Sequence, residues 1–162
     1  MKLLRATPED LAFLFQLEQQ FCELGLVGGD DRGTHERQMT DPDCLYYMVE
    51  ENGERAGYVI LRGLMSFNHC LELKRIVVAN PGRGLGRQVL RAIVDKAFGE
   101  LSAHRVWLDV YDDNYRARHV YRLFGFVEEG TLRECIKRED GYHSLVVMAI
   151  LESEYRQATN AL

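Results

Sequence analysis

The stretch "NPGRGLGRQVL" at residues 80–90 combines three glycines with two arginines at the start of a helical pattern. Glycine lets the backbone approach a ligand closely. The first N–H groups of a helix point outward and favour an anion. Arg83 and Arg87 add permanent positive charge. The segment therefore predicts a phosphate- or pyrophosphate-binding turn.

Two familiar phosphate-binding motifs do not fit this spacing. A P-loop needs GxxxxGK followed by Ser or Thr, whereas Gln88 follows Arg87 here. A dinucleotide fingerprint needs GxGxxG, whereas Gly82, Gly84 and Gly86 give GxGxG, and the preceding residues have the wrong topology. A glycine-rich turn that only reverses the chain direction is the structural alternative.

The elements that must position this turn can be read from the periodicity of apolar residues. A short strand at 2–5 precedes a helix that Thr7 caps, with Pro8 at its first position, and that reaches about Cys22. The glycine-containing stretch that follows predicts a loop, with a short helix possible from Thr34. Residues 44–63 predict a hairpin that turns at Asn52-Gly53.

The second half of the chain alternates strands and helices. Residues 71–78 predict a strand, Gly84 starts an amphipathic helix, and residues 104–110 predict another strand. A short helix then ends at Gly125, and residues 126–151 predict two long strands joined at Asp140-Gly141. The order β-α-(α)-β-β-β-α-β-α-β-β predicts one α/β (α+β) domain over residues 1–162.

Composition limits the classes of function. The net charge is −5, distributed as −7 over residues 1–55 and +2 over the rest, which lacks the basic footprint of a nucleic-acid binder. The acidic first third would suit a cationic substrate, although a solvated surface explains any single acid in it. No apolar run reaches the roughly 18–20 residues of a membrane span. We therefore expect a protein without a nucleic-acid or membrane partner and without a cleaved leader.

The four cysteines are scattered singly. Cys22, Cys44, Cys70 and Cys135 form no CxxC motif and have no histidine at zinc-ligand spacing. This pattern favours free thiols in a reducing compartment, so we expect a cytoplasmic protein without a metal site.

A second segment identifies a family. "DVYDDNYRARHVYRLFGF" resembles the N-x-x-A-x-x-x-Y-x-x-x-G-F stretch of the GCN5-related N-acetyltransferases, the GNAT superfamily. "VVANPGRGLGRQVL" precedes it at the usual separation, and the tail "EEGTLRECIKREDGYHSLVVMAILESEY" is similar to the branch of ribosomal-protein N-terminal and diamine acetyltransferases. Where the superfamily loop has Gln or Arg, this chain has Pro81, which removes one donor and one charge.

The resemblance implies a GNAT fold: a mixed, mostly antiparallel sheet with a splayed parallel strand pair, flanked by helices. Acetyl-CoA would be the co-substrate, held between residues 71–78 and 104–110 without a metal. The residues implied to bind it are Ile76, Val77, Val78, Arg83, Gly84, Leu85, Gly86, Arg87, Gln88, Asn114 and Tyr121. For Asn114 a helix N-cap is the alternative role.

The implied reaction is transfer of an acetyl group to a primary amine by direct attack in a ternary complex. Tyr121 matches the family tyrosine near the thioester sulfur and would protonate the departing thiolate. Asp109 lies where some relatives carry a catalytic glutamate, and Glu72 is the competing general base; an ordinary salt bridge is the alternative for both. No cysteine nucleophile is required.

The acceptor is less defined than the cofactor. A peptide N-terminus, a polyamine or another small amine would suit an acidic rim, and we expect residues 24–33 and 64–70 to shape the choice. Trp107 and Phe67 are candidates for a substrate slot or for core packing. An apolar strand edge near the C-terminus would allow a homodimer. A non-catalytic acyl-CoA-binding sensor of the same fold is the alternative to an enzyme.

Overall fold

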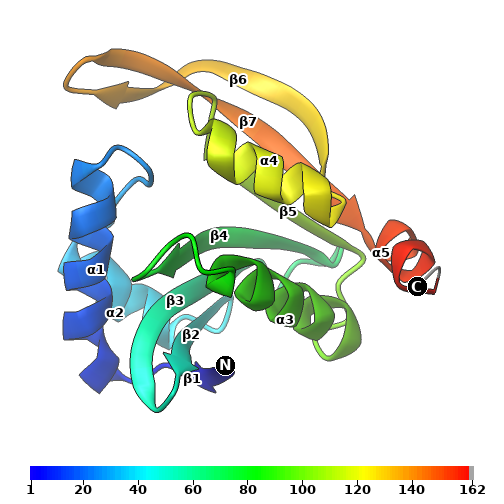
Figure 1. The fold of residues 1–162 in the computed structure, drawn as a ribbon, viewed down its shortest axis with the longest axis horizontal. Helices are drawn as coiled ribbons and strands as arrows, with labels where there is room; N and C mark the ends of the chain where they lie inside the picture. Colours follow the sequence, from blue (N-terminus) through cyan, green and yellow to red (C-terminus); the bar gives the residue numbers. More distant parts are fainter. Residues whose placement is uncertain (161–162) are drawn as a thin grey trace.

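The computed structural model describes residues 1–160 as one sheet with helices on both faces (Figure 1). The strands are β1 (Lys2–Arg5), β2 (Cys44–Glu51), β3 (Glu54–Arg62), β4 (Cys70–Val78), β5 (Arg105–Tyr111), β6 (Val127–Arg138) and β7 (Gly141–Leu151). The helices are α1 (Leu11–Glu23), α2 (Arg32–Thr40), α3 (Leu85–Gly99), α4 (Tyr115–Phe124) and α5 (Glu152–Asn160), with a single 3-10 turn at Pro8–Asp10.

The seven strands lie in the order β1-β2-β3-β4-β5-β7-β6. Every pairing is antiparallel except that between β4 and β5. A parallel pair needs a crossover connection, and α3 supplies it. This confirms the predicted fold class, a mixed and mostly antiparallel sheet with one parallel pair.

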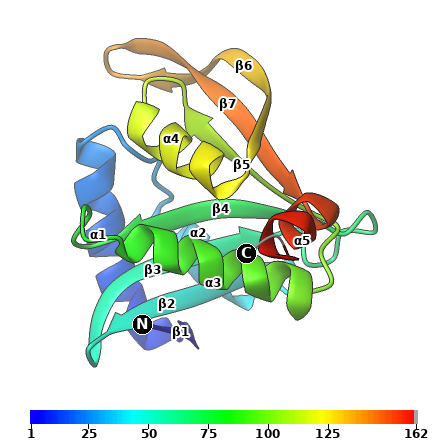
Figure 2. The ribbon, with the colours of Figure 1, turned by 45° about the vertical axis from the view of Figure 1, so that its right-hand side comes forward.

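The helices cover the two faces of the sheet in separate layers (Figure 2). On one face α3 buries an apolar stripe that includes Val89, Ile93 and Ala97 against β2 to β5. On the other face Leu14 and Leu17 of α1 pack against β2 to β4. Full burial of a Val, Leu or Ile side chain stabilises the fold by roughly 1.5–3 kcal/mol, so both layers hold the central strands in place.

The parallel pair parts soon after it forms. β4 and β5 pair only at Cys70–Glu72 and Arg105–Trp107, and beyond these residues the two strands separate. Near the same point β3 and β4 change register between Ile60 and Leu61, which leaves Lys74 without a partner on β3. Such a bulge bends its strand. The sheet therefore opens between β4 and β5, as Figure 1 shows.

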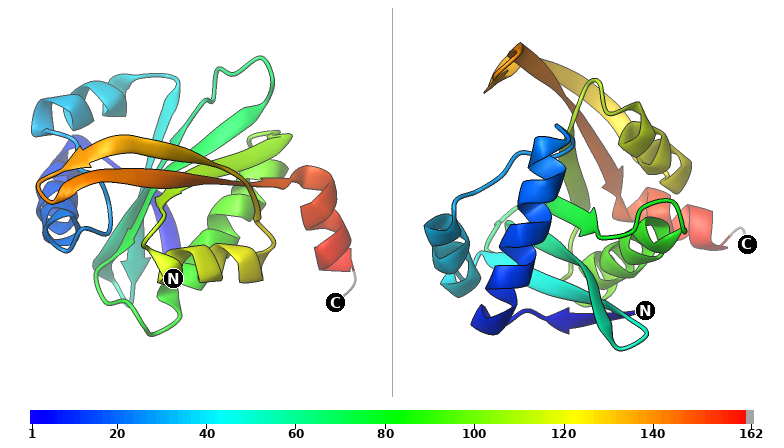
Figure 3. Two further views of the ribbon diagram at one scale, coloured as in Figure 1. Left: turned by 90° about the horizontal axis from the view of Figure 1, so that it is seen from above. Right: turned by 60° about the vertical axis from the view of Figure 1, so that its left-hand side comes forward.

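Two elements differ from the prediction. Helix α2 begins two residues before Thr34, because the Asp31 side chain caps it by accepting a hydrogen bond from the Thr34 N–H at 2.9 Å. Helix α5 was not predicted. It follows β7 near the C-terminal end of the chain (Figure 3) and consists mostly of polar residues, but Tyr155 is 7% exposed and packs against Phe98 and Phe124. One apolar anchor in nine residues gives no periodic pattern.

Within residues 1–160, none of the helices has both the length and the apolar character needed to span a lipid bilayer.

Candidate active site

A cleft of about 860 Å³ occupies the place where β4 and β5 part. Its walls come from β4, β5, α4, the turn before α3, and the loop between α1 and α2. We call this loop, residues 24–31, the strap. The cleft therefore gathers segments from the first, middle and last thirds of the chain.

The predicted glycine turn forms one end of the cleft. Gly82 and Gly84 have positive φ angles of 101° and 82°, which glycine adopts without strain, and Gly84 is the N-cap of α3. Gly84, Gly86 and Arg87 line the cleft, with Pro81 beside them. The other predicted members of the turn, Arg83, Leu85 and Gln88, do not line it; Leu85 is buried in the core.

The backbone of β4 forms one wall, and alternate residues face opposite ways. The Ala79 N–H donates to the Ala56 carbonyl at 2.8 Å, so Ala79 and Val77 direct their backbone groups toward β3. Ile76 and Val78 therefore direct theirs toward the gap where β5 has departed. Of the three residues predicted to pair with a ligand, two present their backbone to the cleft, whereas that of Val77 faces β3.

Helix α4 covers the gap from above, and Asn114 is its N-cap. The Asn114 side chain caps the helix by accepting from the Ala117 N–H at 3.1 Å, and it donates to the Leu26 carbonyl at 3.4 Å. Asn114 also lines the cleft, so the cap and a place beside a ligand are compatible. No residue of α4 is fully buried, because its apolar face opens into the cleft.

Tyr121 lies on this inner face of α4. It packs against Phe126, with ring centroids 5.7 Å apart, and lines the cleft. Burial raises the pKa of Tyr121 to about 12, and the negative charge of Asp109 adds to the rise. The phenol therefore keeps its proton at neutral pH and can donate it.

Two carboxylates on the separating strands face the same cleft. Asp109 on β5 is exposed to the cleft, yet burial by the surrounding walls raises its pKa; Arg75 and then Arg62 oppose the rise. Burial also raises the pKa of Glu72 on β4, although its ion pair with Arg62, at 3.0 Å, opposes this. Among the described residues Asp109 forms no ion pair, so its carboxylate is the freer proton acceptor.

The end of the cleft opposite the glycine turn has apolar walls. Phe21 from α1, Leu26 and Val27 from the strap, and Ile136 and Leu145 from the β6–β7 hairpin contribute to it. The prediction that residues 24–33 shape this end agrees with the strap's position. The prediction for 64–70 does not, because that loop precedes β4 at the closed end of the sheet, and none of its residues lines the cleft as far as the structure describes it.

The two aromatic candidates for a substrate slot lie elsewhere. Phe67 is 95% exposed on the β3–β4 loop, so it belongs neither to the core nor to the cleft. Trp107 is half-buried on β5 at the point where that strand still pairs with β4. Across residues 1–160 no group of three His, Cys, Asp or Glu side chains is arranged to hold a metal ion.

The sequence prediction missed the charged residues of β4 and the acids opposite them. Lys74 and Arg75 line the cleft, and they pair with Asp30 of the strap and Glu18 of α1. One signal was available: Glu18 follows Leu14 and Leu17 on the apolar stripe of α1, where an ionised group needs a buried partner.

Curated relatives of the chain are acetyltransferases. Over 122 residues, 75% of this chain, it is 27% identical to spermidine N(1)-acetyltransferase of Escherichia coli (strain K12); that match spans 66% of the relative, slightly less than two thirds. Over 135 residues, 78% of this chain and 83% of the relative, it is 30% identical to N-alpha-acetyltransferase RimI of Mycobacterium tuberculosis.

The fold has a solved counterpart over nearly its whole length. Spermidine N-acetyltransferase from Vibrio cholerae, crystallised with CoA and spermine, matches with a TM-score of 0.85 and 25% identity over 96% of this chain and 97% of that one. The same enzyme in a dodecameric structure matches with a TM-score of 0.82. A model of the acetyltransferase (GNAT) family matches residues 11–126. The chain therefore belongs to the GNAT family of acetyltransferases.

Proposed function

We propose that this chain is an N-acetyltransferase that moves an acetyl group from acetyl-CoA to a primary amine in a ternary complex. The observation that supports this most strongly is the gap between β4 and β5. It has an anion-binding turn at one end and a proton donor, Tyr121, beside a proton acceptor, Asp109, in the same cleft.

The cleft fits an extended thioester that carries phosphates. The N–H groups at the start of α3 and the side chain of Arg87 suit a pyrophosphate. The backbone groups of Ile76 and Val78 can pair with the amides of a pantetheine arm, as an added strand would. Pro81 has no N–H to offer, and Arg87 and Arg116 supply positive charge at this end, because Arg116 also lines the cleft and its Nη2 would lie 3.8 Å from a Cβ atom at Gly82.

The acceptor amine must lose a proton before it attacks. An alkyl ammonium has a pKa near ~10.4 and an α-ammonium near ~7.7–8.0, so a base is needed at neutral pH. We assign this role to Asp109, directly or through water, because its raised pKa makes it a better base than an ordinary carboxylate. Glu72 stays the competing base, although Arg62 already pairs with it.

Attack and departure of the leaving group use groups on opposite walls. The amine nitrogen bonds to the thioester carbon, and the carbonyl oxygen becomes an oxyanion that a backbone N–H of Ile76 or Val78 can stabilise. When the C–S bond breaks, Tyr121 gives its proton to the departing thiolate. The products are the acetylated amine and CoA with a free thiol.

The acceptor class follows from the apolar end of the cleft and from the relatives. A polyamine is supported by the spermidine acetyltransferases, and a peptide N-terminus by the N-alpha-acetyltransferase. Glu18 and Asp30 of the first third do not line the cleft and are paired with Arg75 and Lys74, so they add little free negative charge to this end. The side chains that do line it, among them Phe21, Leu26 and Val27, favour an amine with an apolar neighbour over a polycation.

The test is release of CoA thiol with a panel of amines, followed by mass detection of the products. The panel contains spermidine, spermine, peptides with a free amino terminus and simple alkyl amines. The proposal predicts an acetylated product with at least one class. Acetyl-CoA binding without turnover on any amine would instead support a sensor, which no observation in the cleft favours.

We also propose a cytoplasmic location and a homo-oligomer, a homodimer being the simplest form. All four cysteines are free thiols, as in a reducing compartment. Strand β6 is a sheet edge of twelve residues with Val127 and Leu132 exposed, and the Vibrio cholerae enzyme has been observed as a dodecamer. Light scattering tests the assembly.

A further inference from the structure

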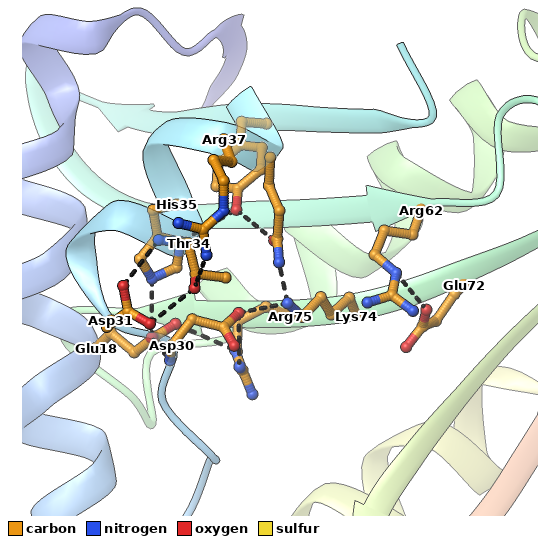
Figure 4. A network of polar contacts seen from close by, with 12 residues as sticks. Glu18, Asp30, Asp31, Thr34, His35, Arg37, Arg62, Glu72, Lys74 and Arg75 are labelled. Carbon is orange, nitrogen blue, oxygen red and sulfur yellow. Dashed lines mark hydrogen bonds and ion pairs between the residues drawn. The ribbon is translucent and has the colours of Figure 1, made fainter. Parts of the chain in front are cut away.

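A network of buried charges lies beneath the strap, between α1, α2 and β4 (Figure 4). Its centre is Glu18, whose side chain is fully buried. Glu18 accepts hydrogen bonds from the Tyr58 hydroxyl at 2.6 Å and the Asp30 N–H at 2.8 Å. It also lies 3.0 Å from His35 Nε2 and 3.2 Å from Arg75 Nε.

These partners keep Glu18 ionised. Burial alone would raise its pKa, but the hydrogen bond with His35, the charge of Arg75 and the hydrogen bonds from Tyr58 and Asp30 lower it to about 2. An ionised carboxylate only accepts hydrogen bonds. The Nε2 atom of His35 must therefore carry a proton.

The other ring nitrogen of His35 must also carry a proton. Gln38 Oε1 accepts from Lys74 Nζ at 3.1 Å, and because an ammonium only donates, the orientation of this amide is fixed. The Tyr46 hydroxyl uses its single proton to donate to the same Oε1 at 2.8 Å. It therefore accepts from His35 Nδ1, 3.0 Å away. His35 is consequently a buried imidazolium, paired with Glu18.

The strap is attached to both arms of the open sheet. On the β4 side, Asp30 pairs with Lys74 and lies 3.9 Å from Arg75 Nη2, and its N–H binds Glu18. On the other side, Arg138 of β6 donates to the Gly25 carbonyl at 3.0 Å. The Asn114 amide donates to the Leu26 carbonyl. The strap thus crosses the apolar end of the cleft opposite the glycine turn. We call this the acceptor end, because the proposed function places the amine there.

We propose that the buried Glu18–His35 ion pair is a positioning element for the acceptor site. The inference rests on the proposed function. The imidazolium holds Glu18, Glu18 holds the Asp30 amide and the guanidinium of Arg75, and these two hold the strap against β4. The strap in turn supplies the apolar wall formed by Leu26 and Val27. Neither Glu18 nor His35 lines the cleft, so both act through other residues.

The position of Gly28 shows how closely the strap is fitted. A Cβ atom at Gly28 would lie 3.3 Å from the Tyr111 hydroxyl and 4.0 Å from Arg75 Nη1. A strap that moved away from β4 would therefore change the width of the acceptor end directly. Among residues 1–160 no hydrogen bond or ion pair joins the glycine turn before α3 to this network, so we expect cofactor binding to be unchanged when the network is disrupted.

The test compares Glu18→Gln with a matched control, Asp10→Asn. Both substitutions neutralise a buried carboxylate associated with α1, since Asp10 is 8% exposed and pairs with Arg55 at 2.7 Å. Asp10 lies before the first turn of α1, whereas the strap follows its last turn. Hydrogen exchange is measured on both folded variants, so the result does not depend on any activity. Glu18→Gln should raise the exchange rate of amides in residues 24–31 at least tenfold, and Asp10→Asn should leave it within twofold.

Kinetics give the second measurement. With spermidine or an alanine-led peptide as acceptor, whichever reacts faster, Glu18→Gln should raise the acceptor KM about tenfold. It should leave kcat and the acetyl-CoA KM within about threefold, and Asp10→Asn should change none of the three. Equal exchange in both variants, or an acceptor KM no higher than that of the control, would overturn the positioning role. A chain that acetylates no amine would refute the proposed function, while the exchange result would still decide on the strap.

The protonation state is tested separately by nitrogen NMR of the histidine rings at pH 7.5. The His35 signals are those that change in Tyr46→Phe, which removes the partner of Nδ1. Both nitrogens should show the shifts of protonated ring nitrogens. One nitrogen in the unprotonated range would overturn the ion pair with Glu18.

Discussion

Asp109 and Tyr121 line the same cleft, and the charge of the carboxylate adds to the burial that raises the pKa of the phenol. Asp109 lies on β5 and Tyr121 on α4, so the separation of β4 from β5 creates the space they share. A carboxylate with a raised pKa accepts a proton readily, and a phenol with a raised pKa keeps its own. In the proposed reaction Asp109 is the base and Tyr121 is the acid.

Tyr121→Phe should lower kcat while acetyl-CoA still binds. Loss of a general acid reduces the rate by about 10²–10⁴-fold, and the ring that packs on Phe126 is retained. Steady-state kinetics at saturating acceptor and calorimetry with CoA measure the two effects. An unchanged kcat would remove the hydroxyl from the mechanism.

Asp109→Asn should flatten the acidic limb of the pH profile. The base works when ionised, so kcat/KM of the parent enzyme rises as pH increases through the raised pKa of Asp109. The amide has no such titration, and kcat/KM at pH 7.5 should fall by about 10²–10⁴-fold. Glu72→Gln is the matched comparison, and its kcat/KM should still rise with pH on the acidic side of the profile. If Glu72→Gln removes it instead, the assignments of the two carboxylates must be exchanged.

The same Asp109→Asn variant should be more stable than the parent at neutral pH. Because the pKa of Asp109 is raised in the folded state, its ionised form costs stability above that pKa. The difference should shrink as pH falls toward ~4, where an unfolded aspartic acid also becomes protonated. A Tm increase on the order of 2 °C at pH 7.5 is expected.

Asp10→Asn should have the opposite effect on stability to Asp109→Asn. The pKa of Asp10 is lowered, because hydrogen bonds from Thr7 and the pairing with Arg55 outweigh burial. Its ionised form therefore stabilises the fold above the ordinary carboxyl range, and the variant should melt at a lower temperature than the parent at pH 7.5. Thermal melts of both variants across pH 4–8 check the two signs together.

Arg87→Ala should weaken acetyl-CoA binding, whereas Arg83→Ala should weaken it much less. Both arginines are exposed in the same turn, but only Arg87 lines the cleft. A hydrogen bond between charged groups contributes about 1.5–3 kcal/mol, which corresponds to roughly a tenfold to hundredfold rise in Kd. Calorimetry with CoA measures it. Equal losses in both variants would show that the turn binds through its overall charge.

Gly57→Ala should destabilise the fold next to the cleft. A Cβ atom there would lie 2.3 Å from the Val77 carbonyl oxygen, so β3 and β4 would have to move apart. Overpacking of this kind costs about 1–3 kcal/mol. Gly130→Ala on β6 is the control, because a Cβ atom at that position meets nothing within 4 Å. Urea denaturation should separate the two variants clearly.

Periodicity and turn chemistry were sufficient for most of the fold. The apolar residues of α3 repeat at helical spacing, and Asn52-Gly53 joins β2 to β3, so these elements were predicted close to their bounds. Helix α5 was missed because its stability comes from the contacts of Tyr155 with Phe98 and Phe124, which are remote in sequence. Local patterns carry no information about such a partner.

The site residues that lie in short local motifs were predicted. Those that depend on pairing between segments distant in the sequence were missed. The glycine turn and Tyr121 lie in short segments with recognisable spacing, and both reach the cleft. Glu18 and His35 are seventeen positions apart, and they meet only because α1 and α2 pack on the same face of the sheet. The acidic first third predicts a cationic substrate, and sequence alone does not show that two of its acids, Glu18 and Asp30, pair with Arg75 and Lys74 of β4.

The brief pairing between β4 and β5 has a mechanical consequence. Within the described residues only three residue pairs join β4 to β5, so α3, α4 and the strap provide the remaining connection between the two parts of the sheet. A molecule that lies in the opening and pairs with the exposed edge of β4 supplies the backbone hydrogen bonds that β5 does not make there. Its arrival should stiffen the whole domain, and the loaded protein should unfold as a tighter cooperative unit than the empty one.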